Sequence, residues 1–200
     1  MRMQARGTTT IVALMTAAAL AGCGGSSGGG GASTTLSGVE PQNVAVTLAS
    51  DAIHGGRLPA LYTCDGRDVS PPLSWGAFPA GINEVALFVV GARRSKNGQA
   101  LASIEWAMAG VKPGLRGLRA GEIPPGAFVL ANSHGARRYS ICPAKGSTKR
   151  YAFALYALPR TARASPAISG VQLLTNLTQT RVQADLSPAG GGFSVTYTRG

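Results

Sequence analysis

The feature that most constrains the fold is a continuous apolar run, Glu84-Val-Ala-Leu-Phe-Val-Val90, which stands between segments rich in glycine and proline. Its β-branched and aromatic residues favour a central β-strand, and the run is too short for a buried helix. The chain of 200 residues contains 28 glycines and 12 prolines, which are the strongest local markers of turns. The chain is therefore expected to fold around strands that are joined by long loops.

Four further segments have the pattern of strands, at 44–48, 101–108, 150–158 and 193–198. Within 101–108 the alternation predicts that Ile104, Trp106 and Met108 share one face. One segment, Val171–Leu186, has apolar residues at helical spacing, and Ser169-Gly170 precedes it as a possible start. These patterns together predict a mostly β fold with one late helix.

The N-terminal segment has the features of an export signal. Arg2 and Arg6 precede an apolar stretch at 11–21, which is too short to span a bilayer. The stretch ends in Leu20-Ala-Gly-Cys23, which resembles the bacterial lipobox, where the cysteine is lipidated after cleavage. We therefore expect residues 1–22 to be a lipoprotein signal peptide and Cys23 to anchor the protein to the cell membrane, outside the cytoplasm. An ordinary signal peptide with a chance cysteine is the alternative.

The segment after Cys23 separates this anchor from the rest of the chain. Residues 24–35 read GGSSGGGGASTT, a composition typical of a flexible linker. We expect residues 23–35 to form the lipidated cysteine and its tether, and residues 36–200 to form one domain. Without Arg2 and Arg6 the chain keeps 17 basic and 8 acidic residues, a positive charge that favours anionic lipid headgroups. No motif predicts a nucleic-acid partner.

The sequence contains few side chains suited to catalysis or metal binding. His54 and His134 both lie beside glycines in predicted loops, and no G-x-S-x-G motif is present. No cluster has the spacing of metal ligands, so the sequence predicts no enzyme, no metal and no cofactor. Cys64 and Cys142 remain as an even pair in an exported protein, which favours a disulfide; two separate buried thiols are the alternative.

Two segments, 58–75 and 138–151, carry a more specific signal. The first contains Tyr62-Thr-Cys-Asp-Gly-Arg-Asp-Val-Ser-Pro-Pro-Leu-Ser-Trp75, and the second runs from Arg138 to Tyr151. Together they resemble the bacterial branch of the phosphatidylethanolamine-binding protein family, also called Raf kinase inhibitor-like proteins. The resemblance implies antiparallel β-sheets with short peripheral helices and a C-terminal helix. It also implies an anion pocket at one end of the sheet, which both cysteine-bearing segments border.

The residues that match this pocket depart from the family pattern. The acidic D-P-D-x-P loop of the family falls on Gly91-Ala-Arg-Arg-Ser95, so both acids are missing. The two family histidines fall on Glu105 and Lys149, whereas Asp65 and Tyr151 are retained. A buried glutamate needs a cationic partner, and Lys149 is expected to pair with Glu105 if both side chains point inward.

Two functions are consistent with a pocket altered in this way. The first is a membrane-anchored module that binds a small anionic ligand or a lipid headgroup. Its expected ligand-binding residues are Asp65, Arg93, Glu105, Lys149 and Tyr151. The second is an interaction protein that has lost ligand binding and contacts an envelope or secreted protein partner.

Overall fold

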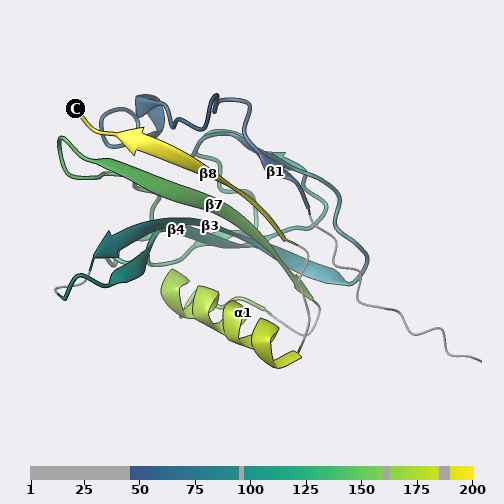
Figure 1. The fold of residues 1–200 in the computed structure, drawn as a ribbon. Helices are drawn as coiled ribbons and strands as arrows, with labels where there is room; N and C mark the ends of the chain where they lie inside the picture. The colour runs from purple at the N-terminus through teal and green to yellow at the C-terminus, as the bar shows by residue number, and fades with distance from the viewer. Residues whose placement is uncertain (1–45, 95–96, 160–162, 185–189) are drawn as a thin grey trace, which may run out of the picture. The chain divides into compact units, whose positions relative to one another are not determined.

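A five-stranded antiparallel sheet forms the centre of the fold. The computed structural model describes residues 46–94, 97–159, 163–184 and 190–200 (Figure 1). The strand order of this large sheet is β6-β4-β3-β7-β8. Its strands are β3 (Ile82–Arg94), β4 (Ala100–Val111), β6 (Phe128–Val129), β7 (Thr148–Pro159) and β8 (Gly190–Thr198). The signal peptide, lipidated Cys23 and tether predicted over 1–35 lie outside the described residues.

A smaller sheet and two helical segments complete the structure. The small sheet has the order β1-β2-β5, with β1 at Leu48–Ala49, β2 at Leu73–Trp75 and β5 at Gly117–Leu118. A short 3₁₀ helix, η1, spans Ala60–Tyr62, and the helix α1 spans Gly170–Ala184. The predicted fold class, mostly β with antiparallel sheets and a late helix, is confirmed. No helix in the described ranges is long and apolar enough to cross a membrane.

The start of α1 follows from its sequence. Ser169 Oγ accepts a hydrogen bond from Gln172 N, and Gln172 Oε1 accepts one from Ser169 N, both at 3.1 Å. This reciprocal pair satisfies two backbone N–H groups that a helix start leaves without partners. The predicted start at Ser169-Gly170 is therefore confirmed.

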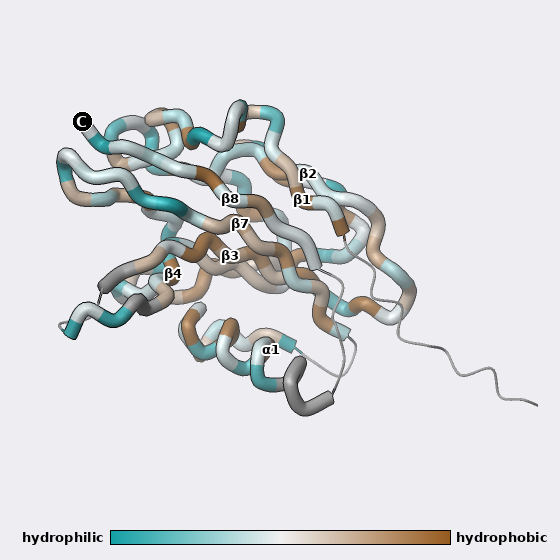
Figure 2. The backbone as a smooth tube through the Cα atoms, in the orientation of Figure 1, coloured by the Kyte–Doolittle hydropathy of each residue, from teal (hydrophilic) through white to brown (hydrophobic). Residues whose placement is uncertain are grey.

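Each face of the large sheet is covered by a different layer, and each layer has its own core. The helix α1 packs against one face, and the small sheet with its loops covers the other (Figures 1 and 2). On the helix side, Phe88 and Ile104 pack with Leu173 of α1. On the other side, Val89, Trp106 and Phe153 belong to the larger core. We call these the helix-side face and the small-sheet face.

A β-bulge in β4 decides which face Glu105 occupies. Val89 is opposite Trp106, but the next residue, Val90, is opposite Ile104. Glu105 is therefore an extra residue without an opposite partner, and a bulge of this kind breaks the alternation of side chains. As a result Ile104 lies in the helix-side core and Trp106 in the other core. The prediction that Ile104 shares a face with Trp106 and Met108 is wrong for this reason.

Candidate functional site

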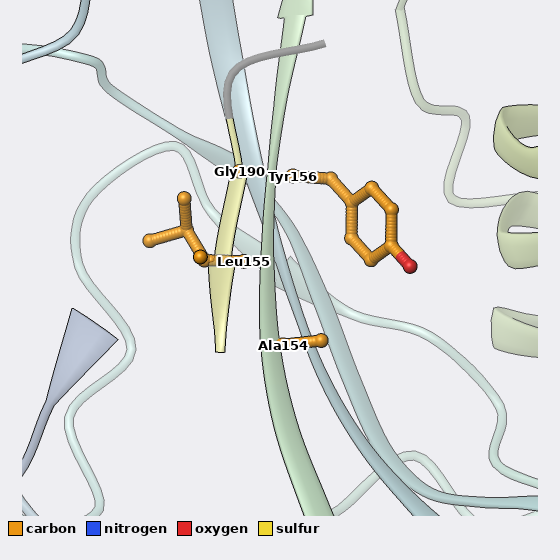
Figure 3. A pocket seen from close by; sticks show the side chains of 5 residues that line it. Ala154, Leu155, Tyr156 and Gly190 are labelled. Carbon is orange, nitrogen blue, oxygen red and sulfur yellow. The ribbon is translucent and has the colours of Figure 1, made fainter. Parts of the chain in front are cut away.

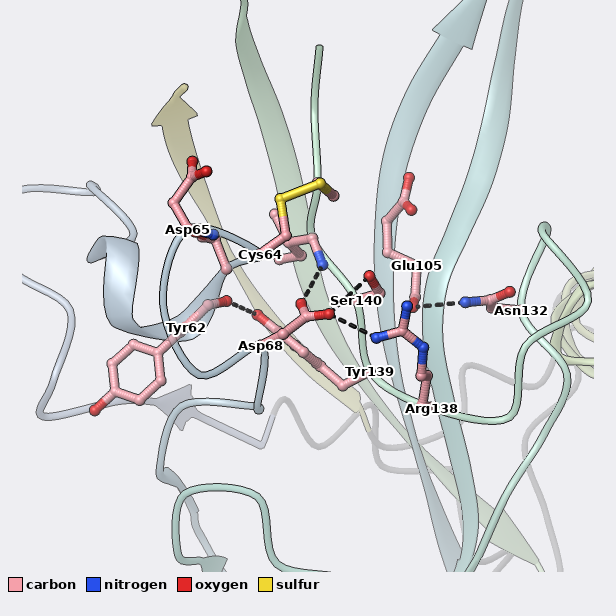
Figure 4. Close-up of polar contacts among 12 residues, drawn as sticks. Tyr62, Cys64, Asp65, Asp68, Glu105, Asn132, Arg138, Tyr139 and Ser140 are labelled. Atoms are coloured by element: carbon pink, nitrogen blue, oxygen red, sulfur yellow. Dashed lines mark hydrogen bonds and ion pairs between the residues drawn. A yellow bond between two sulfur atoms is a disulfide. The ribbon is translucent and has the colours of Figure 1, made fainter. Parts of the chain in front are cut away.

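The ends of four strands meet at one end of the large sheet, where two loops cover the small-sheet face. The strand ends belong to β3, β4, β7 and β8, and the loops are 60–68 and 132–142 (Figure 4). This is the end at which the family resemblance predicts a pocket. We call the group Gly91, Glu105, His134, Lys149 and Tyr151 the sheet-end site.

A disulfide joins the two loops. Cys64 and Cys142 are bonded, and their Cα atoms are 5.2 Å apart. Two hydrogen bonds run beside it: Cys64 N donates to Ile141 O at 3.1 Å, and the side-chain Tyr139 Oη donates to Tyr62 O at 3.0 Å. The predicted disulfide is therefore confirmed, and it lies within a wider set of contacts between the same loops.

Asp68 supplies the polar part of this connection. Its carboxylate accepts hydrogen bonds from Arg138 Nη1 at 2.7 Å, Ser140 Oγ at 3.0 Å and Ile141 N at 3.3 Å (Figure 4). Asp68 has φ 49°, a backbone conformation that aspartate adopts more readily than most residues. The sequence analysis missed this role, although Asp68 belongs to the string that carries the family resemblance.

Asp65, a predicted ligand-binding residue, contacts the C-terminal strand. Its carboxylate accepts hydrogen bonds from Tyr197 Oη at 2.5 Å and from Arg199 Nε at 3.0 Å. The hydrogen bond from Tyr197 lowers the pKa of Asp65, and the same bond raises the pKa of Tyr197. Arg199 Nη1 also lies 3.2 Å from Cys142 Sγ. Asp65 therefore connects the disulfide to the end of β8.

Glu105 is nearly buried and faces His134. Its side chain is only 12% exposed, and its Oε2 lies 3.4 Å from His134 Nε2. The expected ion pair with Lys149 is wrong, because the two side chains do not come within 4.0 Å of each other. Within the described part of the chain, no hydrogen bond is formed by the Glu105 carboxylate.

The position of His134 follows from its loop, which is fixed to the bulge. Ile104 N donates to Ser133 Oγ at 2.8 Å, and Ser133 N donates to Ile104 O at 2.9 Å. Asn132 Nδ2 adds a longer contact, 3.4 Å, to the carbonyl oxygen of Glu105 (Figure 4). The His134 side chain is 65% exposed, as predicted for a loop histidine, but its contact with Glu105 was not foreseen.

Gly91 allows Glu105 and Tyr151 to lie close together. A Cβ atom on Gly91 would lie 2.9 Å from Glu105 Oε1 and 3.1 Å from the Tyr151 ring. Tyr151 is 2% exposed, and its hydroxyl forms no hydrogen bond to a described residue. Burial, and next the charge of Glu105, raise the pKa of Tyr151. Glu105 and Tyr151 therefore fill the space that the missing acidic side chain at position 91 would enter.

The two basic residues that were predicted to bind a ligand are Lys149 and Arg93. Lys149 is half-buried and lies opposite Tyr197, two residues before Tyr151 and on the same face of β7. The structure gives it no ion pair with a described residue. Arg93 lies opposite Leu101 in the register of β3 and β4, and its side chain is outside the described residues.

A separate hollow lies toward the other end of β7 and β8. It has a volume of about 240 Å³ and is lined by Ala154, Leu155, Tyr156, Gly190 and Gly191 (Figure 3). None of these residues was predicted to bind a ligand, and none carries a charge. Among the residues the structure describes, no three His, Cys, Asp or Glu side chains group together as metal ligands.

Comparison with known sequences identifies relatives over most of the chain. Residues 49–191 match the family model of phosphatidylethanolamine-binding protein. "Putative lipoprotein LppC" of Mycobacterium tuberculosis H37Rv is 32% identical over 148 residues, which cover 73% of this chain and 70% of that protein. A UPF0098 protein of Methanothermobacter thermautotrophicus is 33% identical over 125 residues, covering 60% of this chain and 80% of that protein.

Solved structures show the same fold. CT736 of Chlamydia trachomatis, described as a phosphatidylethanolamine-binding protein homologue, superposes with a TM-score of 0.63 at 25% identity. It covers 78% of this chain and 99% of its own. YbcL of Escherichia coli gives the same TM-score and coverage at 20% identity. On the match to the family model and these likenesses, the chain belongs to the phosphatidylethanolamine-binding protein family.

Proposed function

We propose that this protein is a membrane-anchored, extracytoplasmic lipoprotein whose folded domain binds a small polar ligand or a lipid headgroup at the sheet-end site. The observation that carries the proposal is the pair Glu105 and Tyr151. Both residues are largely buried, and the Glu105 carboxylate and the Tyr151 hydroxyl form no hydrogen bond to a described residue. Neither group is among the fully buried unpartnered atoms of the described residues, so both polar groups are accessible to solvent. A bound ligand would replace water as the hydrogen-bond partner of these two groups.

The anchoring part of the proposal has two independent supports. The first is the sequence Leu20-Ala-Gly-Cys23, which has the features of a lipidation site. The second is the likeness to a mycobacterial protein that is named as a lipoprotein. A lipid on Cys23 and the Gly/Ser-rich segment after it would hold the domain near the membrane surface. The excess of basic residues would favour the anionic headgroups there.

Calorimetric titration of the purified full chain in a nonionic detergent tests the binding. Phosphoethanolamine is a suitable probe because it combines the two charged groups of a common lipid headgroup. We expect saturable binding of one molecule per chain. Tyr151→Phe removes only the hydroxyl and should weaken binding about 2- to 12-fold, the effect of one hydrogen bond. Tyr156→Phe is the matched control, because Tyr156 contacts Phe88 on the other face of the same strand.

A protein-interaction role is the second candidate, and one observation favours it. Glu105 and Tyr151 occupy the space above Gly91, so the site is partly filled by the chain itself. If phosphoethanolamine gives no saturable heat, the binding proposal fails and the interaction role becomes the better one. We propose a binding role and not an enzymatic one in either case. The hydroxyl of Ser133, next to His134, is already bonded to the backbone of Ile104.

A further inference from the structure

The helix-side face of the large sheet has an exposed end that α1 does not cover. In the view of Figure 1, the strands β3, β7 and β8 extend past the first turn of α1 at this end. Five residues cross the face there in one line, which we call the exposed row: Arg57, Thr196, Arg150, Ala92 and Ala102. Four of them are exposed, and Thr196 is half-buried. Alanines in a sheet are commonly buried, so the exposure of these two shows that no described part of the chain packs on this end.

The strand register places the side chains of the exposed row on one face. Arg57 is bridged to Thr196, and Thr196 lies opposite Arg150. Opposite residues share a face and neighbouring strands are about 4.8 Å apart, so the Cα atoms of Arg57 and Arg150 are separated by about 10 Å. The adjacent residues Leu58 and Tyr151 belong to the core on the small-sheet face, as the alternation of side chains requires.

The two arginines of the exposed row have no acidic partner in the described chain. None of the ion pairs among the described residues includes Arg57 or Arg150, and neither guanidinium group forms a hydrogen bond there. By contrast, Arg138 is bonded to Asp68 at 2.7 Å. Both guanidinium groups of the exposed row are therefore available to a partner from outside the chain.

We propose that the exposed row docks on the anionic surface of a lipid bilayer, with Arg57 and Arg150 bound to lipid phosphates and the Thr196 hydroxyl as a further donor. This inference rests on the membrane-anchored part of the proposed function, and it names the face of the domain that meets the membrane. A planar guanidinium can donate two hydrogen bonds to one phosphate, which makes arginine well suited to this contact.

The residue types of the exposed row favour a lipid surface over a protein partner. Protein interfaces depend on large side chains that fill pockets in the partner, whereas this row has only alanine and threonine beside its arginines. A bilayer surface presents many phosphates and requires no complementary shape. An anchored domain also stays near that surface, so even a weak contact forms at a high effective concentration.

The length of the chain before Val46 is compatible with this contact. Val46 N donates to Gly190 O at 3.2 Å, at the opposite end of β8 from Thr196. The strand from Gly190 to Thr196 spans about 20 Å. The chain from Cys23 to Val46 can extend to about 80 Å at most, so an anchor at Cys23 leaves enough length for the exposed row to reach the bilayer.

Arginine footprinting on vesicles tests the proposal without any substitution. The purified full chain is added to vesicles of phosphatidylcholine, alone or mixed with phosphatidylglycerol, and treated with phenylglyoxal, which modifies accessible guanidinium groups. Each basic residue at an anionic surface contributes about fivefold to binding, so Arg57 and Arg150 should react at least about fivefold more slowly on the anionic vesicles. Arg116 and Arg119, which are exposed on either side of β5, are the internal controls and should react equally on both.

A single substitution shows whether the two arginines act together. Arg150→Gln should remove most of the protection of Arg57 on anionic vesicles, because the remaining contact is weaker. Arg116→Gln makes the same change of charge in the small-sheet layer, and it should leave the protection of Arg57 unchanged. High salt should abolish the protection in the unsubstituted protein, since it screens surface charges.

Equal modification of Arg57 and Arg150 on the two kinds of vesicle would overturn the inference and leave an acidic protein as the better partner for the exposed row. Protection that extends equally to Arg116 and Arg119 would also overturn it, because the attraction would then have no preferred face. The mass of the peptide that contains Cys23 reports lipidation separately. A lipidated Cys23 without protection means that the anchor stands and the docking fails, and protection with an unmodified Cys23 means the reverse.

Discussion

Removal of the disulfide gives the prediction whose magnitude is best defined. We consider the double substitution Cys64→Ser with Cys142→Ser. The bridge closes a loop with a sequence separation of 78. In the chain-entropy treatment, opening such a loop in the unfolded state lowers the free energy of unfolding by about 4.5 kcal/mol. A typical domain has only about 5–15 kcal/mol in total, so this bond accounts for roughly a third to nine-tenths of such a stability.

The structure indicates that this loss arises in the unfolded state. Without the bridge, the hydrogen bond from Cys64 N to Ile141 O and the contacts of Asp68 still hold the two loops together. The folded variant should therefore keep the arrangement around Glu105. Its phosphoethanolamine affinity should also match that of the bridged protein.

Urea unfolding under non-reducing conditions, followed by tryptophan fluorescence, measures the effect. Trp75 and Trp106 are both buried in the larger core, on the small-sheet face, and report its loss. The dependence of the unfolding free energy on urea should become steeper, because the opened chain exposes more surface. As a control, Asp68→Asn keeps the bridge and should cost about 1–3 kcal/mol with no change in slope. A loss below about 1 kcal/mol for the double variant would refute the reasoning.

Three further predictions concern other parts of the chain. Cys23→Ala should block lipid attachment and move the protein from the membrane to the soluble fraction; mass spectrometry showing an unmodified Cys23 in the mature protein would contradict this. The hydrogen bond from Tyr197 is the main cause of the lowered pKa of Asp65 in the folded state. The ionised carboxylate therefore stabilises the folded state at pH values above its ordinary pKa of 3.8, and this stabilisation is lost as the pH falls through the lowered pKa. Asp65→Asn should therefore be less stable than the unsubstituted protein at pH 7, and the difference, measured by urea unfolding, should shrink as the pH falls below 3.8. A Cβ on Gly191 would overlap the carbonyl oxygen of Val46, so Gly191→Ala should lower the free energy of unfolding by about 1–3 kcal/mol; an unchanged thermal midpoint would show that this segment moves aside freely.

The strands that the sequence predicted are the ones that contact large cores. The runs at 84–90 and 150–158 contain apolar residues on both faces because each strand lies between two cores. Such a pattern is visible without any knowledge of the partners. The strand predicted at 44–48 overlaps β1 at Leu48, and residues 44 and 45 lie outside the described residues. The strands β2, β5 and β6 have two or three residues each, too few for a periodic pattern. Pairing with neighbouring strands defines them, so they could not be predicted.

The residue types at the site were also visible in the sequence. The family resemblance led to Glu105 and Tyr151, and the even number of remaining cysteines led to the bridge between Cys64 and Cys142. In each case the residue itself carries the signal, because a glutamate in an apolar strand or a cysteine pair in an exported chain is conspicuous.

The contacts of these residues were decided by the tertiary structure alone. The bulge that directs Glu105 toward Tyr151 depends on the register between β3 and β4, which a strand pattern does not specify. His134 reaches Glu105 only because Ser133 binds the backbone of Ile104, 29 residues away. Pairings over such separations depend on the complete arrangement of the chain, so local sequence can name the charges at a site but cannot assign their partners.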